Sequence, residues 1–193
     1  MTKYILVGGY PRKATDGGKA FSEELVKGFS EPVKILECLF ARSRDNWETA
    51  YAEDVGFFQK HLPDRKLDFQ LAQPDTFVKQ IHWADAIYIR GGEMEPLYER
   101  LAQSPGWEKE LDGKTFAGSS AGAYAITKYN HKLDTPELGE GLGLLPLKVL
   151  AHYRSDYNAP NIDWDKAERD LKSYKEDLPL VALREGEFRV FEH

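Results

Sequence analysis

Strand-like segments alternate with segments of helical periodicity along the first two-thirds of the chain. The hydrophobic pattern predicts strands at 4–7, 33–40, 67–71, 86–89 and 115–117. Between them, apolar residues recur at helical spacing, as in Phe21, Leu25, Val26 and Phe29. Strands that alternate with helices predict a three-layer α/β/α fold, in which a mostly parallel sheet lies between two layers of helices.

The last third of the chain has a weaker pattern. Residues 130–143 are polar and rich in glycine, which predicts an irregular surface stretch. Strands are predicted at 145–151, 180–183 and 187–191, and a helix at 164–174. Because no repeat, low-complexity segment or linker divides the sequence, we expect residues 1–193 to form a single domain.

One predicted strand is followed by a motif that carries chemistry. The segment Gly118-Ser-Ser-Ala-Gly122 lies between the strand at 115–117 and a run of small residues that starts a helix. This is the G-x-S-x-G nucleophile elbow, whose small neighbours permit the strained turn that presents the serine. We therefore predict Ser120 as a nucleophile. The alternatives are a plain turn of glycine and serine or a phosphate-binding loop.

A serine hydroxyl becomes a good nucleophile only when a base takes its proton. The histidines of the chain are His61, His82, His131, His152 and His193. Only His152 directly follows a predicted strand of the sheet, so we predict His152 as the base. The alternative for His152 is a structural histidine in the core beside Tyr153.

The base in turn requires a carboxylate that orients it and stabilises its charged form. The candidates are Asp134, Glu137, Glu140, Asp156 and Glu185. Asp156 is close to His152 in the sequence and can reach it locally, whereas Glu185 lies in a turn directly after a buried strand. Position along the chain does not decide between these two residues.

Two backbone N–H groups are expected to stabilise the oxyanion of the transition state. One belongs to Ala121, which directly follows the nucleophile. The second is expected from Gly92, in the glycine-rich loop after the strand at 86–89. Ligands bind beyond the carboxyl ends of parallel strands. We therefore expect Gly92, Ser120, His152 and Glu185 to meet at one edge of the sheet.

Composition narrows the classes of partner. The chain has 193 residues, of which 41% are hydrophobic and 30% charged, as in a globular protein. A net charge of −6 without a basic tract argues against a nucleic-acid partner. The single cysteine, Cys38, excludes an internal disulfide and a Cys/His zinc cluster, and we expect no metal or organic cofactor. No segment has the pattern of a signal peptide or a membrane span, so we expect a cytoplasmic monomer or homodimer without a membrane partner.

Together, these features resemble those of the dipeptidase E and cyanophycinase family of serine peptidases. The resemblance covers nearly the whole chain and rests on the opening strand, Ile89-Arg-Gly-Gly92, Gly118-Ser-Ser-Ala-Gly-Ala123, Gly141-Leu-Gly-Leu-Leu-Pro146, Ala151-His-Tyr153 and Leu183-Arg-Glu-Gly186. It implies a class I glutamine amidotransferase-like (flavodoxin-like) fold. It also implies hydrolysis of short peptides, including aspartyl or β-aspartyl bonds, through an acyl-enzyme.

The same resemblance implies which residues form the catalytic triad. Members of the family use Ser, His and Glu in that order along the chain. Transferred to this sequence, the triad is Ser120, His152 and Glu185, and Asp134 matches a second acid implicated in some relatives. The resemblance therefore favours Glu185 as the acid that orients His152.

One departure from the family pattern concerns the substrate. Dipeptidase E continues its glycine-rich loop with Asn-Thr, whereas this chain has Glu93-Met94. An added carboxylate at the mouth of the site disfavours an acidic substrate side chain and favours a substrate with a free amino group or a basic group. A substrate carboxylate is expected to bind Arg154 or Arg169, since arginine pairs with carboxylates in bidentate fashion.

A non-catalytic member of the same fold, which binds a small molecule or a protein in the crevice, is the alternative function. Such a protein would keep Ser120 but would leave His152 and Glu185 beyond hydrogen-bonding reach of the site. An esterase of the α/β-hydrolase type is disfavoured because those enzymes place the acid before the histidine in the sequence. An amidotransferase would need cysteine at the elbow.

Overall fold

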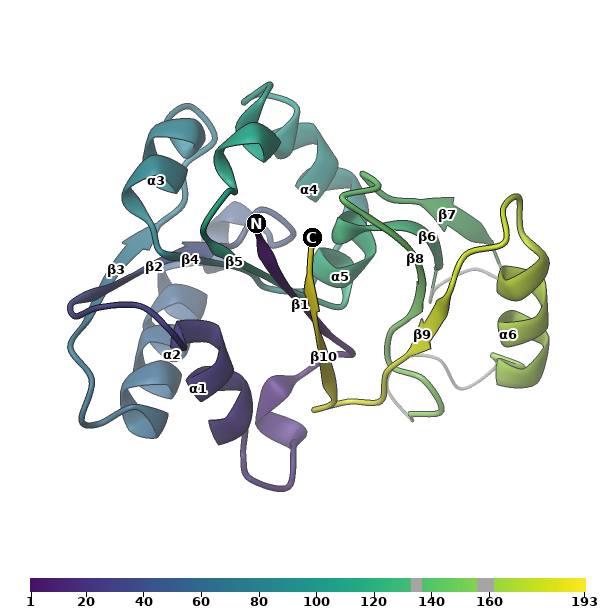
Figure 1. Cartoon of the computed structure of the whole chain (residues 1–193), viewed down its shortest axis with the longest axis horizontal. Coiled ribbons are helices and arrows are strands. Elements are labelled where there is room, and N and C mark those ends of the chain that lie inside the picture. The colour runs from purple at the N-terminus through teal and green to yellow at the C-terminus, as the bar shows by residue number, and fades with distance from the viewer. Residues whose placement is uncertain (133–136, 156–161) are drawn as a thin grey trace.

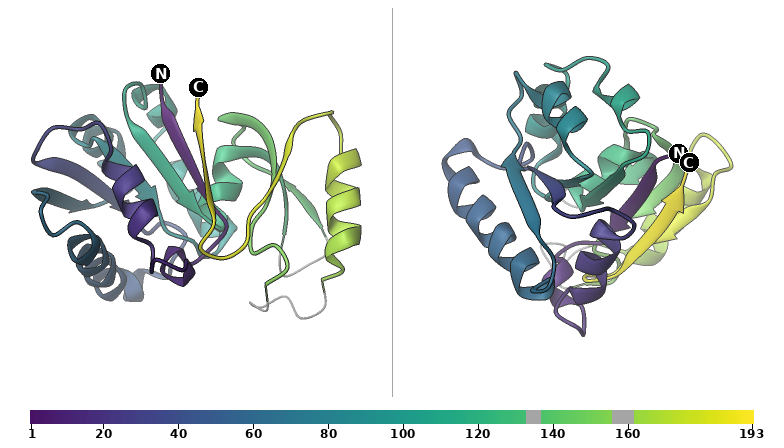
Figure 2. Two further views of the ribbon diagram at one scale, coloured as in Figure 1. Left: turned by 60° about the horizontal axis from the view of Figure 1, so that its bottom comes forward. Right: turned by 60° about the vertical axis from the view of Figure 1, so that its left-hand side comes forward.

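The computed structural model describes residues 1–132, 137–155 and 162–193. Within these residues, the strands form two sheets that lie side by side (Figure 1). The larger sheet has six strands in the order β10-β1-β5-β4-β2-β3, and the smaller has four in the order β7-β6-β8-β9. The two ends of the described chain are neighbours (Figure 2), and the Thr2 N–H donates to the His193 carbonyl at 2.8 Å.

The larger sheet is parallel except at one edge. Its strands are β1 (Lys3–Val7), β2 (Val33–Cys38), β3 (Leu67–Leu71), β4 (Ala86–Ile89), β5 (Thr115–Ser119) and β10 (Phe188–Glu192). Only β10 runs antiparallel, beside β1. The central strands are almost wholly buried, which explains why they appear in the sequence as continuous apolar runs. The predicted α/β fold with a mostly parallel sheet is confirmed.

Helices cover both faces of this sheet, as predicted. One face carries α1 (Lys19–Val26) and α2 (Trp47–His61), and the other carries α3 (Phe77–Trp83), α4 (Met94–Leu101) and α5 (Ala121–Ile126). Short 3-10 helices occupy Pro11–Lys13, Arg44–Asn46 and Trp107–Glu110. The structure is therefore a three-layer α/β/α arrangement around the larger sheet.

The smaller sheet corrects the prediction that residues 130–143 form an irregular surface stretch. It contains β6 (Thr127–His131), β7 (Leu138–Glu140), β8 (Leu145–Leu150) and β9 (Leu180–Ala182), with α6 (Trp164–Ser173) packed against it. Strand β6 is polar in sequence but largely buried, and several of its polar side chains have partners within the fold. The Tyr129 hydroxyl, for example, donates to Glu176 at 2.7 Å. Polarity alone therefore gave the wrong prediction for this segment.

Helix α5 lies between the two sheets and joins their cores. A single cluster of buried side chains includes Phe116 of β5, Ala123 of α5 and Val149 of β8. Because this core is continuous, we keep the proposal that residues 1–193 form one domain. The expectation that the predicted site residues all lie at one edge of a single sheet is wrong. Strands β8 and β9, which precede His152 and Glu185, belong to the smaller sheet.

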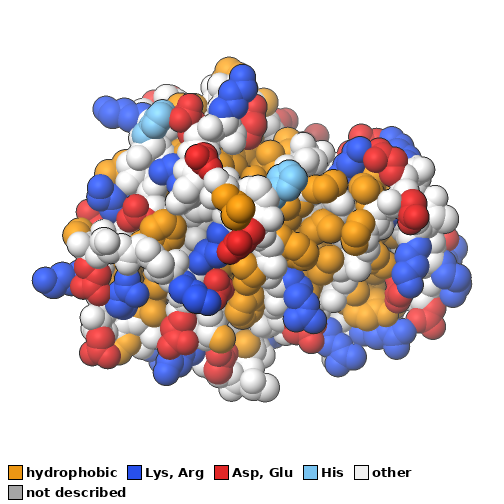
Figure 3. Space-filling model, viewed as in Figure 1, with side chains coloured by type: hydrophobic (Ala, Val, Ile, Leu, Met, Phe, Trp, Pro, Cys, Tyr) orange, Lys and Arg blue, Asp and Glu red, His pale blue; other side chains and the backbone are white. Residues whose placement is uncertain are grey.

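Two features of the structure concern nucleic-acid and membrane partners: the charges on the surface and the lengths of the helices. On the face shown in Figure 3, acidic and basic side chains are intermixed, and no continuous basic area is visible. In the described part of the chain, no helix is both long enough and apolar enough to cross a membrane.

Candidate active site

Ser120 lies in a sharp turn between β5 and α5. Its backbone has φ 52° and ψ −110°, a conformation that a non-glycine residue adopts only under constraint. The Ser120 N–H donates to the Val7 carbonyl at 3.1 Å, and its carbonyl accepts from the Tyr124 N–H at 2.9 Å. These bonds tie the turn to β1 and to the first turn of α5, so the hydroxyl is held in a fixed position.

The two glycines of the elbow motif permit this turn. A Cβ atom on Gly118 would lie 2.3 Å from the carbonyl carbon of Gly122, and one on Gly122 would lie 2.6 Å from the Ile89 carbonyl oxygen. No larger residue allows strand and helix to approach this closely. The close approach brings the start of α5, with its first N–H groups, next to Ser120.

His152 lies in the turn that follows β8, at a positive φ of 54°. Its N–H donates to the Gly8 carbonyl at 2.6 Å. A Cβ on Gly9 would lie only 2.2 Å from Cε1 of the imidazole, so the ring packs directly on the backbone after β1. The side chain is buried, and the glycine pair at the end of β1 thus fixes the position of the imidazole.

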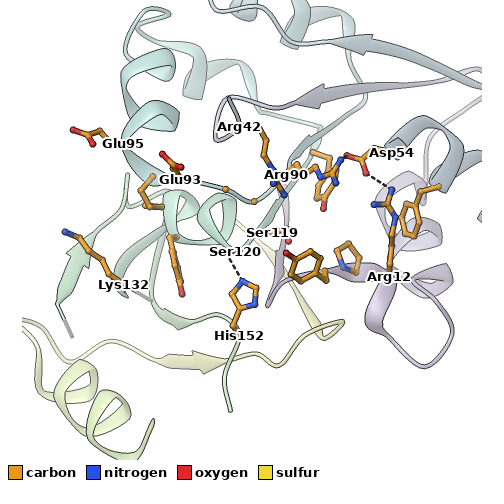
Figure 4. Close-up of a pocket in the computed structure, with 18 of the residues that line it drawn as sticks. Arg12, Arg42, Asp54, Arg90, Glu93, Glu95, Ser119, Ser120, Lys132 and His152 are labelled. Atoms are coloured by element: carbon orange, nitrogen blue, oxygen red, sulfur yellow. Dashed lines mark hydrogen bonds and ion pairs between the residues drawn. The ribbon is translucent and has the colours of Figure 1, made fainter. Parts of the chain in front are cut away.

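The three residues predicted as nucleophile, base and acid lie within hydrogen-bonding distance of one another. Nε2 of His152 is 2.9 Å from Oγ of Ser120, and Nδ1 of His152 is 3.1 Å from Oε1 of Glu185. The dashed line in Figure 4 marks the first of these interactions. The Ser155 hydroxyl also donates to Oε1 of Glu185, at 3.2 Å. The arrangement has the connectivity that a serine nucleophile requires.

The environment of the pair His152 and Glu185 decides where the protons lie. Burial lowers the pKa of His152, against the opposing effect of the Glu185 carboxylate. Burial works to raise the pKa of Glu185, but the hydrogen bonds from Lys13 and His152 outweigh it and lower that pKa. Near neutral pH, Glu185 is therefore ionised and His152 neutral. Since a carboxylate only accepts, Nδ1 carries the imidazole proton and Nε2 accepts from Ser120.

Lys13 is a third neighbour of this pair, which the sequence analysis did not identify. Its Nζ lies 2.7 Å from Oε2 of Glu185, and its side chain is 58% exposed. The positive charge lowers the pKa of His152 as well as that of Glu185. In the sequence, Lys13 belongs to a polar loop without periodicity, so no local signal identified it.

Substitution Lys13→Met is expected to move the acid limb of the pH profile of kcat/KM to higher pH. The base must be neutral to accept a proton, so activity falls as the pH drops through the pKa of His152. Removing the Lys13 charge favours the imidazolium and raises that pKa. The measurement is kcat/KM against pH for both proteins, with Lys19→Met, an exposed lysine on α1, as the control. A limb that stays in place or moves to lower pH would contradict the expectation.

A cavity of about 710 Å³ opens beside Ser120 and His152 (Figure 4). Of the residues predicted to bind substrate, Glu93 lines this cavity. Arg154 and Arg169 do not: Arg154 pairs with Asp165 at 2.6 Å, and Arg169 is exposed on α6. The structure thus provides no support for either arginine as a substrate contact, because both lie outside the cavity wall.

Two of the other acids considered for the triad are paired with lysines, and one of these, Glu137, also lines the cavity. Glu137 pairs with Lys132 at 3.0 Å, and Glu140 pairs with Lys175. Asp134, the predicted alternative acid, and Asp156 lie outside the described residues. Glu185 is the candidate acid that the structure places beside His152.

The glycine-rich loop after β4 lies between Ser120 and the loop after β2. A Cβ on Gly91 would lie 2.9 Å from Cβ of Ser120, and one on Gly92 would lie 2.1 Å from the Ala41 carbonyl oxygen. That carbonyl accepts from the Glu93 N–H at 2.8 Å. The backbone of this loop therefore packs directly against the Ser120 side chain at Gly91, and the role of Gly92 as an oxyanion donor stays a prediction.

Arg90, at the start of this loop, is bound to α2. Its guanidinium donates to the Ala50 carbonyl at 3.0 Å, to Asp54 at 3.1 Å and to Glu53 at 3.0 Å. Burial and the neighbouring Asp54 carboxylate raise the pKa of Glu37 well above its usual range.

In the described residues, no group of three or more His, Cys, Asp or Glu side chains is placed to hold a metal ion.

Comparisons with known proteins identify the family. The family model for peptidase family S51 matches residues 41–192. No curated protein matches the chain. Among solved structures, a peptidase from an acI-B1 actinobacterium superposes with a TM-score of 0.64 at 20% identity, over 99% of this chain and 83% of that one. A putative peptidase E protein from Listeria monocytogenes EGD-e superposes with a TM-score of 0.65 at 16% identity, over 99% of this chain and 97% of that one.

The two kinds of comparison carry different information. At identities of 20% and 16%, the solved structures establish the shared fold. The family match covers most of the chain, including the elbow and the segments around His152 and Glu185. It confirms the resemblance found in the sequence: the chain belongs to peptidase family S51 and is a serine-type peptidase of the peptidase E type.

Proposed function

We propose that the protein hydrolyses short peptides through a triad of Ser120, His152 and Glu185. The observation that carries the proposal is the continuous hydrogen-bonded chain, with 2.9 Å from Ser120 Oγ to His152 Nε2 and 3.1 Å from His152 Nδ1 to Glu185 Oε1. The non-catalytic alternative required His152 and Glu185 to lie out of reach, so these distances favour the enzyme.

The proposed reaction follows from the positions of the protons. As Ser120 Oγ attacks the peptide carbonyl carbon, Nε2 of His152 takes the hydroxyl proton, and Glu185 stabilises the resulting imidazolium. The C–N bond then breaks, and His152 returns this proton to the leaving amine. Water attacks the acyl-enzyme with His152 again as the base, which releases the acid and restores the Ser120 hydroxyl.

The oxyanion of each tetrahedral intermediate is proposed to accept hydrogen bonds from Ala121 and Gly92. Ala121 starts α5, and the first N–H groups of a helix have no acceptor within it. Gly92 follows the glycine that packs on Ser120, so its N–H belongs to one of the two peptide groups that flank that contact. Each such donor contributes about 3–4 kcal/mol to transition-state stabilisation.

The cavity supports a small substrate with a free amino group. A volume of about 710 Å³ falls within the range of pockets for small ligands. Glu93 and Glu95 line its outer part and are exposed. Their carboxylates provide a negative surface for the α-ammonium group of a dipeptide or for a basic side chain. Aspartyl and β-aspartyl dipeptides remain within the proposed substrate class.

The proposal is tested by labelling and by peptide hydrolysis. A fluorophosphonate probe is expected to modify Ser120, as located by mass spectrometry of the peptides. Amine release is then measured from Asp-Leu, β-Asp-Leu, Lys-Leu and N-acetyl-Lys-Leu, and the acetylated peptide is expected to be the poorest substrate. Unlabelled Ser120 together with no release from any peptide would instead favour the non-catalytic binding protein.

A further inference from the structure

Among the residues that the structure describes, four lysine or arginine side chains line the cavity, and three of them are already paired with carboxylates. Arg12 lies 2.8 Å from Asp54, Arg90 lies 3.1 Å from the same carboxylate, and Lys132 lies 3.0 Å from Glu137. These three are largely neutralised by the protein itself. The fourth cation, Arg42, has no carboxylate partner among the described residues.

The Arg42 guanidinium makes no side-chain hydrogen bond or ion pair with any residue that the structure describes, although its Nε is buried. An arginine is charged at every relevant pH, and a buried donor without a partner costs free energy. Arg42 nevertheless lines the cavity on the side of Arg90 (Figure 4). A charged donor in this position has the chemistry to bind an anion that enters the cavity.

The backbone of Arg42 is fixed next to the glycine-rich loop. Its carbonyl accepts from the Trp47 indole N–H at 3.1 Å and from the Arg100 guanidinium at 2.8 Å. The preceding residue, Ala41, accepts from the Glu93 N–H at 2.8 Å. Because the base of the side chain is held by these bonds, less conformational entropy is lost when the guanidinium binds a ligand.

The charges around Ser120 are separated in space. Figure 4 shows Arg42 next to Arg90, and Glu93 and Glu95 further from Arg90 in the same view. A peptide with an ammonium group at one end and a carboxylate further along matches this separation. The planar guanidinium also matches a carboxylate in bidentate geometry, which a lysine cannot reproduce.

We infer that Arg42 binds a carboxylate group of the peptide substrate and thereby determines specificity. The inference rests on the proposed peptidase function and names the substrate group that the cavity selects. Two groups of a short peptide have this chemistry: the C-terminal carboxylate and the side chain of an acidic residue. The test distinguishes them.

Binding is measured by calorimetry in the Ser120→Ala background, so that no peptide is consumed. The ligands are Asp-Leu, Asn-Leu, which lacks the side-chain carboxylate, and Asp-Leu amide, which lacks the terminal one. Adding Arg42→Met is expected to weaken the binding of Asp-Leu by roughly 10- to 100-fold, with Arg42→Lys intermediate. Adding Arg189→Met, an exposed arginine on β10, serves as the control for the loss of one positive charge.

The pattern across the ligands identifies the carboxylate. If Arg42 binds the C-terminal group, Arg42→Met weakens Asn-Leu as it does Asp-Leu but leaves Asp-Leu amide unaffected. If Arg42 binds the side chain, the amide is sensitive and Asn-Leu is not. Equal effects on all three ligands, no effect, or no binding of any ligand would overturn the inference.

Fluorophosphonate labelling separates this inference from the proposed function. The probe carries no carboxylate, so Ser120 is expected to be labelled equally in the wild type and in Arg42→Met. Labelled Ser120 without carboxylate-dependent binding would overturn the role of Arg42 alone. Carboxylate-dependent binding with Ser120 unlabelled would overturn the peptidase mechanism alone.

Discussion

Replacing Ser120 by alanine is expected to lower kcat for peptide hydrolysis by about 10⁶-fold, the scale seen when a triad nucleophile is removed. The loss is large because alanine has no hydroxyl that could attack the peptide carbonyl carbon. His152 Nε2 lies 2.9 Å from this oxygen, and the elbow conformation at φ 52° directs it into the cavity. Residual activity would come only from substrate binding and the oxyanion donors.

Single-turnover hydrolysis of the best peptide of the panel is the measurement for this prediction. Ser173→Ala, which removes a hydroxyl from the exposed face of α6, is the matched control and is expected to retain full activity. Circular dichroism of each variant verifies that the fold is intact. A rate for Ser120→Ala within about tenfold of the wild type would reject Ser120 as the nucleophile.

The elbow and the larger sheet could be predicted from the sequence because their determinants are local. Gly118 and Gly122 lie close to Ser120 in the chain, and the contact between them requires small residues whatever the rest of the fold does. The buried parallel strands are short apolar runs, and the length and hydrophobic periodicity of such runs identify them as strands. Such local patterns can be recognised in the sequence without knowledge of the tertiary contacts.

The smaller sheet and the neighbours of the triad depend on contacts between distant residues. Strand β6 is polar in sequence and gains its burial from packing against β7, β8, α5 and α6. Lys13 reaches Glu185 across 172 positions of sequence (185 − 13), and no periodicity links them. Gly9 lies just after β1, as Gly92 lies after β4, but nothing in the sequence identifies His152 as the residue that packs on it.

Position along the chain does not decide between Asp156 and Glu185 as the acid proposed to orient His152. Of these two, Glu185 lies in the described part of the chain, beside Nδ1 of His152, and Ser155 and Lys13 also contact its carboxylate. A carboxylate with three such partners is held in one orientation, which is what the imidazole requires of it.

Substitution Glu185→Gln is therefore expected to lower kcat by about 10³- to 10⁴-fold, with a much smaller change in KM. The amide is neutral, so it cannot stabilise the imidazolium, and its NH₂ group stabilises the wrong imidazole tautomer. Glu185 also raises the pKa of His152, so its removal lowers that pKa. The acid limb of the residual activity is thus expected to move to lower pH, opposite to the effect of Lys13→Met.

Two matched variants make the test of Glu185 specific. Glu187→Gln changes an exposed acid of the same turn, whose side chain accepts from the Arg184 N–H at 2.9 Å, and is expected to leave kcat within about threefold. Asp134→Asn removes the alternative acid. If Asp134→Asn lowers kcat more than Glu185→Gln does, the acid has been wrongly assigned. If both carboxylates matter, the double variant shows whether they act on the same imidazole, because losses within one functional unit do not add.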